Sequence, residues 1–292
     1  MNKISVSIPG CNGRMGKTLL TLILENPKYE IASATCLPNE DEIGIDIGIF
    51  AGKSKINKEI KDEPKSLFQN SHVLIDFTAP DATMIHAKEC YSNNMSIVIG
   101  TTGLNEEQEK ELLSLSKKIP IVYSANFSIG VTLLSKLVSN ATKTLGIDWD
   151  VEVLEMHHKQ KVDSPSGTAL LLGKSAANAR QQELSNVKSV SRDGLVGKRK
   201  QDEIGFAVLR GGDVVGEHSV LFFNSGERIE LAHKATDRSI FASGALRASY
   251  WAANAQPGLY SLADVLENGG WINLIQNLIY VFKTSIFINF SV

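Results

Sequence analysis

The sequence predicts an α/β fold in two parts: a parallel-sheet domain with helices on both faces, then an α+β domain built on a mixed sheet. Over the first 128 residues, short apolar runs alternate with helical patterns, which is typical of a covered parallel sheet. After residue 145, strand patterns follow one another through short turns that contain glycine, as in an antiparallel or mixed sheet. A length of 292 residues also favours two domains over one core.

In the first part, the strands are continuous apolar runs and the helices carry apolar residues at helical spacing. We expect strands at 3–8, 29–36, 72–78, 96–102 and 119–127, and helices at 13–26, 81–94 and 105–118. Residues 38–65 fit neither pattern, and we expect them to form an irregular excursion.

In the second part, the pattern predicts a sheet with one main helix. The expected strands are 149–158, 203–212, 216–224 and 228–235, and the helix is 167–181. The polar stretch 192–203 is expected to be a mobile loop. Residues 238–254 again show a helical pattern.

The bulk composition limits the classes of partner. The chain is 43% hydrophobic and 21% charged with a net charge of −2, and its basic residues form no long run. We therefore expect neither nucleic acid nor an acidic membrane surface as the main partner. Cys11, Cys36 and Cys90 form no CxxC pair, which favours a reducing compartment without structural zinc.

The two ends of the chain bear on localisation. The first strand turns into a glycine-rich loop after eight residues, too soon for the apolar region of a signal peptide, so we expect a cytoplasmic protein. The apolar stretch 271–292 is interrupted by Asn, Gln and Lys283. It falls short of a clean span of roughly 20 apolar residues, and we expect a packed helix and strand, or an oligomer contact, rather than a membrane anchor.

A glycine-rich turn, "GCNGRMG", lies between the first strand and the first helix. Gly10 permits a tight turn, Gly13 allows a pyrophosphate to approach the backbone, and Gly16 allows the helix and strand to pack closely. Arg14 can add a charged contact to phosphate. The spacing is GxxGxxG rather than GxGxxG, and the alternative is a tight turn without a ligand. Its position after the first strand favours a Rossmann-type dinucleotide site.

The second strand of such a domain usually ends in an acidic residue that holds the ribose. Here that position is Cys36, followed by Leu37, with Glu40 and Asp41 nearby, so the choice between NAD and NADP stays open. Three loops, 77–80, 100–103 and 124–127, follow parallel strands. Ligands of open α/β sheets bind at this edge, which favours a cofactor groove.

A cationic segment, "HHKQKVDSPSGTALLLG", precedes the second domain's helix. His157, His158 and Lys161 lie where a strand ends. Ser166, Gly167 and Thr168 then open the helix, beside Pro165. Helix-end N–H groups and charged hydrogen bonds attract anions, at roughly 0.3–1 and 1.5–3 kcal/mol each. We therefore expect a small polyanion, most simply a dicarboxylate.

The two candidate proton donors differ in their usual pKa. Histidine has a usual pKa of about 6.5, so it can donate a proton at neutral pH. Lysine has a usual pKa of about 10.4, so it is a good proton donor at neutral pH only if its pKa is lowered. We therefore interpret His157 as the acid and Lys161 mainly as a carboxylate clamp that helps in protonation. Histidine pairs are also common as metal ligands or surface residues, but no cysteine or acid-rich set supports a metal here. Lys159 and Asp163 are expected to be solvated or to make local contacts.

Taken together, these motifs resemble the 4-hydroxy-tetrahydrodipicolinate reductase (dihydrodipicolinate reductase) family of bacterial diaminopimelate and lysine synthesis. The resemblance covers residues 3–267 and rests on "GCNGRMG", "DFTAPDAT", "GTTGL", "SANFSIGV", "EMHHKQKVDSPSGTAL", "IGFAVLRGGDVVGEH" and "GLYSLADVL". It implies a Rossmann-type cofactor domain at 1–128, a substrate-binding and tetramerisation domain at 129–238, and helices at 239–292 that return to the first domain before the apolar tail.

The resemblance also implies the activity and the site residues. NADPH or NADH would reduce a small cyclic dicarboxylate in a homotetramer. His157 and Lys161 would be the proton donors, and His158, Gly167 and Thr168 would bind substrate carboxylates. The implied cofactor-binding residues are Gly10, Cys11, Asn12, Gly13, Arg14, Met15, Gly100, Thr101, Thr102, Ser124, Ala125, Asn126 and Phe127.

The chain departs from the family pattern at several places. The usual HHRxK becomes HHKQK through Lys159 and Gln160, Pro9 precedes the glycine loop, and Cys36 replaces the ribose-binding acid. The tail from about Gly269 has no counterpart in the family. Two rival hypotheses are a nucleotide-sensing regulator without chemistry and an amino-acid or imine dehydrogenase. The first does not account for His157 with Lys161, and the second does not account for the double histidine with "SPSGT".

Overall fold

The computed structural model describes residues 3–190 and 192–268, which fall into two compact units. Among these described residues, unit 1 consists of 3–127 and 241–268, and unit 2 of those within 128–240. The apolar tail from about Gly269 and the expectations for it lie outside the described residues. Within those residues, no helix is long and apolar enough to cross a membrane.

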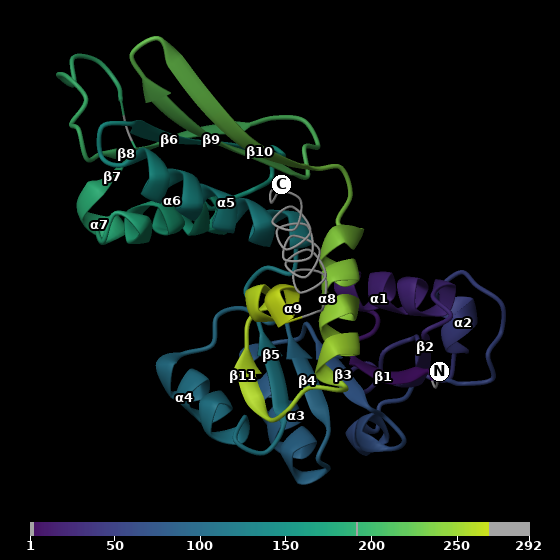
Figure 1. The fold of residues 1–292 in the computed structure, drawn as a ribbon. Helices are drawn as coiled ribbons and strands as arrows, with labels where there is room; N and C mark the ends of the chain where they lie inside the picture. Colours follow the sequence, from purple (N-terminus) through teal and green to yellow (C-terminus); the bar gives the residue numbers. More distant parts are fainter. Residues whose placement is uncertain (1–2, 191, 269–292) are drawn as a thin grey trace, which may run out of the picture. The chain divides into compact units, whose positions relative to one another are not determined.

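Unit 1 is built on a six-stranded parallel sheet (Figure 1). The strand order is β11-β5-β4-β3-β1-β2, and every pairing is parallel. The strands are β1 (Ile4–Pro9), β2 (Tyr29–Thr35), β3 (Val73–Asp76), β4 (Ser96–Ile99), β5 (Pro120–Tyr123) and β11 (Gly258–Tyr260). The Rossmann-type sheet is confirmed, and β11 adds a short strand that the sequence pattern did not predict. Because β3 and β4 are buried along their whole length, three of the four residues in each are apolar and consecutive.

The helices of unit 1 connect and cover these strands. They are α1 (Arg14–Glu25), α3 (Pro80–Ser92), α4 (Glu106–Leu115), α8 (Ser239–Ala252, in this unit from Phe241) and α9 (Leu262–Asn268). The excursion after β2 contains the short helix α2 (Ile47–Phe50) and the 3₁₀ turn η1 (Pro64–Phe68). Asp46 caps α2 by accepting hydrogen bonds from the N–H groups of Gly48 and Ile49 at 2.9 and 3.3 Å.

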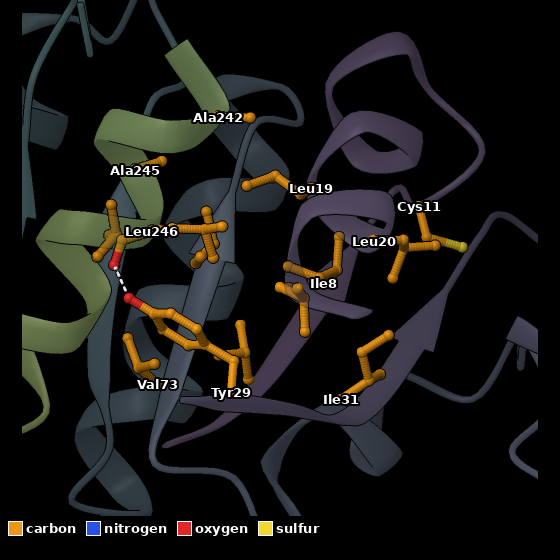
Figure 2. Packing of buried hydrophobic residues seen from close by; sticks show 14 of the residues in the cluster. Ile8, Cys11, Leu19, Leu20, Tyr29, Ile31, Val73, Ala242, Ala245 and Leu246 are labelled. Atoms are coloured by element: carbon orange, nitrogen blue, oxygen red, sulfur yellow. Dashed lines mark hydrogen bonds between the residues drawn. The ribbon is translucent and has the colours of Figure 1, made fainter. Parts of the chain in front are cut away.

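The core of unit 1 packs α1 and α8 against β1, β2 and β3. Figure 2 shows Leu19 and Leu20 of α1 beside Ile8 of β1. The hydroxyl of Tyr29 donates to the carbonyl of Leu246 at 2.8 Å, so a buried polar group of β2 is satisfied by α8. This packing fixes the turn between β1 and α1, which carries the glycine motif.

Unit 2 contains the predicted mixed sheet, in the order β10-β9-β6-β8-β7. Its strands are β6 (Asp150–His157), β7 (Lys188–Ser189), β8 (Ile204–Arg210), β9 (Gly216–Asn224) and β10 (Glu227–Ala235). The pairs β6–β8 and β7–β8 are parallel, whereas β9 is antiparallel to β6 and β10.

The expectation of one main helix in this unit is wrong. Both α5 (Ile129–Leu145) and α6 (Gly167–Ala179) lie against one face of the sheet, and α7 (Leu184–Val187) follows α6 (Figure 1). The buried residues of α5 are Val131, Leu134, Val138 and Thr142, a helical spacing that the sequence analysis passed over. Ser135 and Ser175 join the two helices by a hydrogen bond of 2.7 Å.

The loop at 192–203 contains no helix or strand in its described residues, but its arginines are anchored. Arg192 pairs with Glu152 at 2.8 Å and also with Glu203. Arg199 pairs with Glu152 at 2.9 Å and with Asp150 at 2.6 Å. These contacts attach the loop to the start of β6.

Candidate active site

The glycine turn of unit 1 has the geometry of a phosphate cradle. Gly10 lies at φ +62°, a left-handed conformation that favours glycine. A Cβ on Gly16 would lie 2.5 Å from the Gly10 carbonyl oxygen and 2.6 Å from Cys11 Cα, and one on Gly13 would lie 3.2 Å from the same oxygen. The backbone therefore packs too closely for a side chain at Gly16 and leaves little room for one at Gly13.

The residues around this turn fit a dinucleotide. Helix α1 begins at Arg14 with Gly13 as its N-cap, and its first turn contains no acidic residue. Its N–H groups and dipole therefore present positive charge, with Arg14 exposed and Met15 half-buried beside it. Cys11 is buried, and its N–H donates to the carbonyl of Thr35 at 2.9 Å.

The loops after β3, β4 and β5 meet at the carboxyl edge of the sheet, as predicted. The ring of Phe77 occupies the space where a Cβ on Gly100 would lie, only 2.0 Å from the nearest ring atom. Phe77 also packs edge-to-face against Phe127, with ring centroids 5.7 Å apart. Ser124 N donates to the carbonyl of Ile99 at 3.1 Å, and its hydroxyl donates to the carbonyl of Asn126 at 2.8 Å.

Asp76 organises two of these loops from the buried end of β3. It accepts hydrogen bonds from the N–H and hydroxyl of Thr78 at 2.8 and 2.6 Å and from the hydroxyl of Thr101 at 3.3 Å. His86 Nδ1 contacts its other oxygen at 2.7 Å. Thr101 is buried and Thr102 exposed, so the loop turns one residue inward and the next outward. Neither Asp76 nor His86 was singled out from the sequence.

Cys36, just after β2, stands where an acidic residue was expected, and carboxylates from other positions lie near it. Burial raises the pKa of the Cys36 thiol, and the nearby charges of Glu42, Glu40 and Asp62 add to that effect. Glu42 also reaches the glycine turn, where its carboxylate accepts a hydrogen bond from the Asn12 amide at 3.4 Å. Negative charge is therefore present at this position, contributed by the following loop.

In unit 2, the proposed proton donor His157 is the last residue of β6, and its side chain is only 10% exposed. The inward face of β6 carries Val151, Val153, Glu155 and His157 in alternation. The imidazole Nδ1 of His157 is hydrogen-bonded to the carboxylate of Glu155. Burial lowers the pKa of His157, against the opposing effect of that carboxylate.

Glu155 takes part in four hydrogen bonds with three partners. Besides His157, it accepts two hydrogen bonds from Arg210 at 2.8 and 2.9 Å and one from Ser166 N at 2.9 Å. Burial alone would raise the pKa of Glu155, but the hydrogen bonds from Arg210, Ser166 and His157 outweigh it and lower that pKa. The carboxylate is therefore ionised, and it holds the imidazole of His157 beside the start of α6.

The other cations of the segment lie in the loop that follows β6. Lys161 pairs with Asp163 at 2.8 Å, and this contact lowers the pKa of Asp163. The N–H of His158 donates to the carbonyl of Val214 at 2.8 Å, and its ring contacts Arg238 at 3.3 Å. Arg238, which the sequence did not point to, thus adds a guanidinium to the same loop cluster. Lys159 and Gln160 are exposed.

Helix α6 begins where the sequence predicted. Ser166 is the N-cap, and its hydroxyl accepts a hydrogen bond from Ala169 N at 3.1 Å. Gly167 and Thr168 form the first turn, and a Cβ on Gly167 would meet nothing within 4 Å. A carboxylate can therefore approach the backbone at Gly167.

A second buried histidine, His218, completes the polar cluster. Its Nε2 shares a hydrogen bond of 3.1 Å with the Ser166 hydroxyl, and its ring meets His157 edge-on at 5.0 Å. Burial, followed by the charge of His157, lowers the pKa of His218 to about 4. Among the described residues, no group of three His, Cys, Asp or Glu side chains has an arrangement that could hold a metal ion.

Glu155, Arg210 and His218 were missed by sequence reasoning, although one clue was present. A glutamate at an inward position of an alternating strand, two residues before a histidine, is an unusual buried charge. The pairing of β6 places Arg210 opposite His157 and His218 opposite Glu155. That pairing between distant segments is not visible in the sequence.

Comparison with known proteins identifies relatives over nearly the whole described chain. Residues 4–127 match the family model of the dihydrodipicolinate reductase N-terminus, and residues 130–266 match that of the C-terminus. The 4-hydroxy-tetrahydrodipicolinate reductase of Bartonella bacilliformis is 43% identical over 261 residues, covering 89% of this chain and 97% of the relative.

Solved structures agree with these matches. A dihydrodipicolinate reductase from Paenisporosarcina sp. TG-14 with bound dipicolinate has a TM-score of 0.71 at 28% identity, covering 89% of this chain and 97% of that one. An amine dehydrogenase from Mycobacterium smegmatis (TM-score 0.58, 11% identity, 89% and 95% covered) shares the fold alone. This chain therefore belongs to the dihydrodipicolinate reductase family of oxidoreductases.

Proposed function

We propose that this protein reduces (2S,4S)-4-hydroxy-2,3,4,5-tetrahydrodipicolinate to 2,3,4,5-tetrahydrodipicolinate and water, in diaminopimelate and lysine biosynthesis. The observation that carries the proposal is the unit 2 cluster, where His157, Lys161 and the start of α6 lie within one strand, loop and helix. Dipicolinate, bound by the Paenisporosarcina relative, is a cyclic dicarboxylate. A ligand of that kind matches a site with several cations and an open helix end.

The site residues that the sequence predicted in this cluster each have a role in this reaction. Gly167 and Thr168 bind one carboxylate through the first turn of α6, and His158 assists. Lys161 exchanges its contact with Asp163 for a substrate carboxylate and helps in protonation. The overall reaction replaces the ring hydroxyl with a hydride, and the hydroxyl leaves with one proton as water. His157 donates that proton from its ring and regains one from solvent.

The cofactor-binding residues we propose are those of the unit 1 turn and edge loops. Bound NADH or NADPH supplies the hydride. The turn from Gly10 to Met15 holds the pyrophosphate against the start of α1, and residues 100–102 and 124–127 line the nicotinamide half of the groove. The close packing at Gly16 and Gly100 supports this assignment, because side chains at those positions would displace the turn and the edge loop.

We further propose that NADH is the preferred donor. An added 2′-phosphate on the ribose would approach Cys36, which is surrounded by the charges of Glu42, Glu40 and Asp62. The negative charges of these carboxylates would repel the 2′-phosphate. The hydrogen bond between Asn12 and Glu42 places one carboxylate beside the glycine turn, where it can accept from ribose hydroxyls instead.

We propose a homotetramer assembled through the sheet of unit 2. Helices α5 and α6 cover one face of that sheet (Figure 1). The other face presents Leu154, Met156, Ala207, Leu209, Leu221 and Phe223, and Leu209 is 47% exposed. The apolar part of this face is typical of a subunit interface. A cytoplasmic location is consistent with three free cysteines among the described residues.

The activity is tested with substrate formed in place from aspartate semialdehyde and pyruvate by the preceding synthase. The loss of NADH and NADPH absorbance is followed for the wild type, Lys161→Ala and His157→Gln. We expect rapid oxidation that either change nearly abolishes, with NADH the better donor. No turnover with either cofactor, despite tight binding of one, would contradict the proposal and favour a nucleotide-sensing regulator.

A further inference from the structure

Glu155 occupies the centre of the unit 2 cluster, yet neither the family resemblance nor the reaction assigns it a role. Its carboxylate is fully buried, at 0% exposed. One oxygen accepts from His157 and Arg210, and the other from Arg210 and the N–H of Ser166. Burying a charge is costly unless it is paired and hydrogen-bonded, so this fully satisfied carboxylate beside a proposed proton donor is a specific arrangement.

The protonation of these groups defines the imidazole tautomer. An ionised carboxylate only accepts hydrogen bonds, so the Nδ1 of His157 must carry a proton that it donates to Glu155. The other ring nitrogen, Nε2, is then the atom that gains and loses protons. A Cβ on residue 216 would lie 3.0 Å from this Nε2, so Gly216 leaves space beside the reactive nitrogen.

The contacts of Glu155 also connect three elements. Glu155 and His157 share the inward face of β6, and Arg210 is the register partner of His157 on β8. Ser166 is the N-cap of α6. A single carboxylate therefore fixes the imidazole relative to the helix end where a substrate carboxylate is proposed to bind.

We propose that Glu155, held in place by Arg210, is the positioning residue of this site: it fixes His157 as the Nδ1–H tautomer and aims Nε2 as the proton donor. This inference rests on the proposed function of His157. Protonated Nε2 gives its proton to the substrate, the hydrogen bond from Nδ1 to Glu155 persists throughout, and solvent returns a proton to Nε2. The group that is hydrogen-bonded to the non-reacting ring nitrogen of a functional histidine commonly sets its tautomer and basicity.

The discriminating variant is Glu155→Gln, because an amide cannot replace four accepted hydrogen bonds. If its nitrogen faces His157, the imidazole must switch to the Nε2–H tautomer. If it faces Ser166 instead, the amide N–H groups meet two donors, the N–H of Ser166 and the guanidinium of Arg210, and both hydrogen bonds are lost. The matched control is Glu152→Gln, on the opposite face of the same strand, where Glu152 also pairs with two arginines.

The groups that face His157 predict the direction of the pH effect. Glu155 raises its pKa, whereas burial, Lys161 and Arg210 lower it, and His218 lies edge-on beside it. Removing the negative charge of Glu155 while Arg210 remains must lower the pKa of His157 further. We expect the alkaline limb of the kcat profile to move to lower pH by about one unit.

The experiment combines kinetics with ¹⁵N NMR of histidine-labelled protein. For Glu155→Gln we expect kcat to fall about tenfold or more, KM to change less, and Glu155→Asp to restore part of the rate, while Glu152→Gln matches the wild type. In the wild type, His157 should be the Nδ1–H tautomer. Observing the Nε2–H tautomer there would overturn the proposal even if no Glu155 variant folds.

The outcomes separate this inference from the proposed function. A Glu155→Gln enzyme with wild-type kcat and pH profile, alongside an inactive His157→Gln enzyme, would overturn the positioning role and leave the proposed function intact. Full turnover by His157→Gln would overturn both.

Discussion

The two units build their candidate sites from different parts of the chain. The turn of unit 1 is a backbone structure, in which Gly10, Gly13 and Gly16 allow close packing and the start of α1 presents N–H groups. The cluster of unit 2 is a side-chain network, in which Glu155 joins His157, Arg210 and Ser166. A site made of backbone depends on local spacing, whereas a network depends on which distant residues the sheet brings together.

This difference predicts separable failures. A substitution in the unit 2 network should stop the chemistry and leave cofactor binding unchanged. A substitution in the unit 1 turn should weaken cofactor binding and leave the protonation of the histidines unchanged.

The largest effect is expected from His157→Gln. Loss of a positioned general acid costs about 10²- to 10⁴-fold in rate, so kcat should fall within that range while the affinity for NADH, measured by fluorescence titration, stays at its wild-type value. Lys161→Ala should lower kcat and also raise KM, because Lys161 is proposed both to clamp a carboxylate and to assist the proton. A parallel loss of NADH affinity in His157→Gln would break the separation between the units.

The next effect is expected from Gly16→Ala. The added Cβ would lie 2.5 Å from the Gly10 carbonyl oxygen, so the turn must shift, and overpacking of this kind costs roughly 1–3 kcal/mol. We expect the Kd for NADH to rise about tenfold or more, measured by the same titration. Gly211→Ala is the control, since a Cβ there meets nothing within 4 Å. Equal losses in both variants would argue against a specific role for the turn.

The same difference explains what the sequence revealed. The glycine spacing after the first strand predicted the turn, and the run from His157 to Thr168 predicted the strand end and the start of α6, because both are local patterns. Helix α5 was not predicted, although its buried residues have helical spacing. Arg210 lies 55 positions from Glu155, and only the pairing of β6 with β8 brings them together.

Cys36 shows a third case, in which the local pattern gave an incomplete answer. The residue at the expected acidic position is neutral, but Glu42 from the following loop brings a carboxylate to the glycine turn. The excursion at 38–65 has little regular structure, so its geometry could not be predicted from periodicity. The chemistry of a position can thus be supplied by a neighbour in space.

A smaller effect concerns stability, and it is confined to unit 2. His218 has a folded pKa of about 4 against an ordinary value of 6.5, so the unfolded chain binds a proton that the folded chain refuses. The contribution of His218 to the free energy of unfolding is therefore fully present above about pH 6.5 and is lost as the pH falls toward about 4. Between pH 7.5 and pH 5, the free energy of unfolding should fall by about 2 kcal/mol. Urea unfolding at the two pH values should show this loss, and His218→Gln should reduce it. A pH-independent wild type would contradict the buried neutral state of His218.

The smallest effect is expected from Glu42→Gln, and it sharpens the description of unit 1. Removing one of the carboxylates around Cys36 should favour a 2′-phosphate, and an exposed charge interaction of up to about 1 kcal/mol corresponds to at most about fivefold. We therefore expect the ratio of kcat/KM for NADPH to that for NADH to rise about threefold, and to fall again toward the wild type as salt screens the remaining charges. The control is Glu63→Gln. Glu63 lies in the same excursion, but its charge is not among those that raise the pKa of Cys36. An unchanged ratio would show that backbone contacts alone govern the choice of cofactor, and would make the unit 1 site a backbone structure throughout.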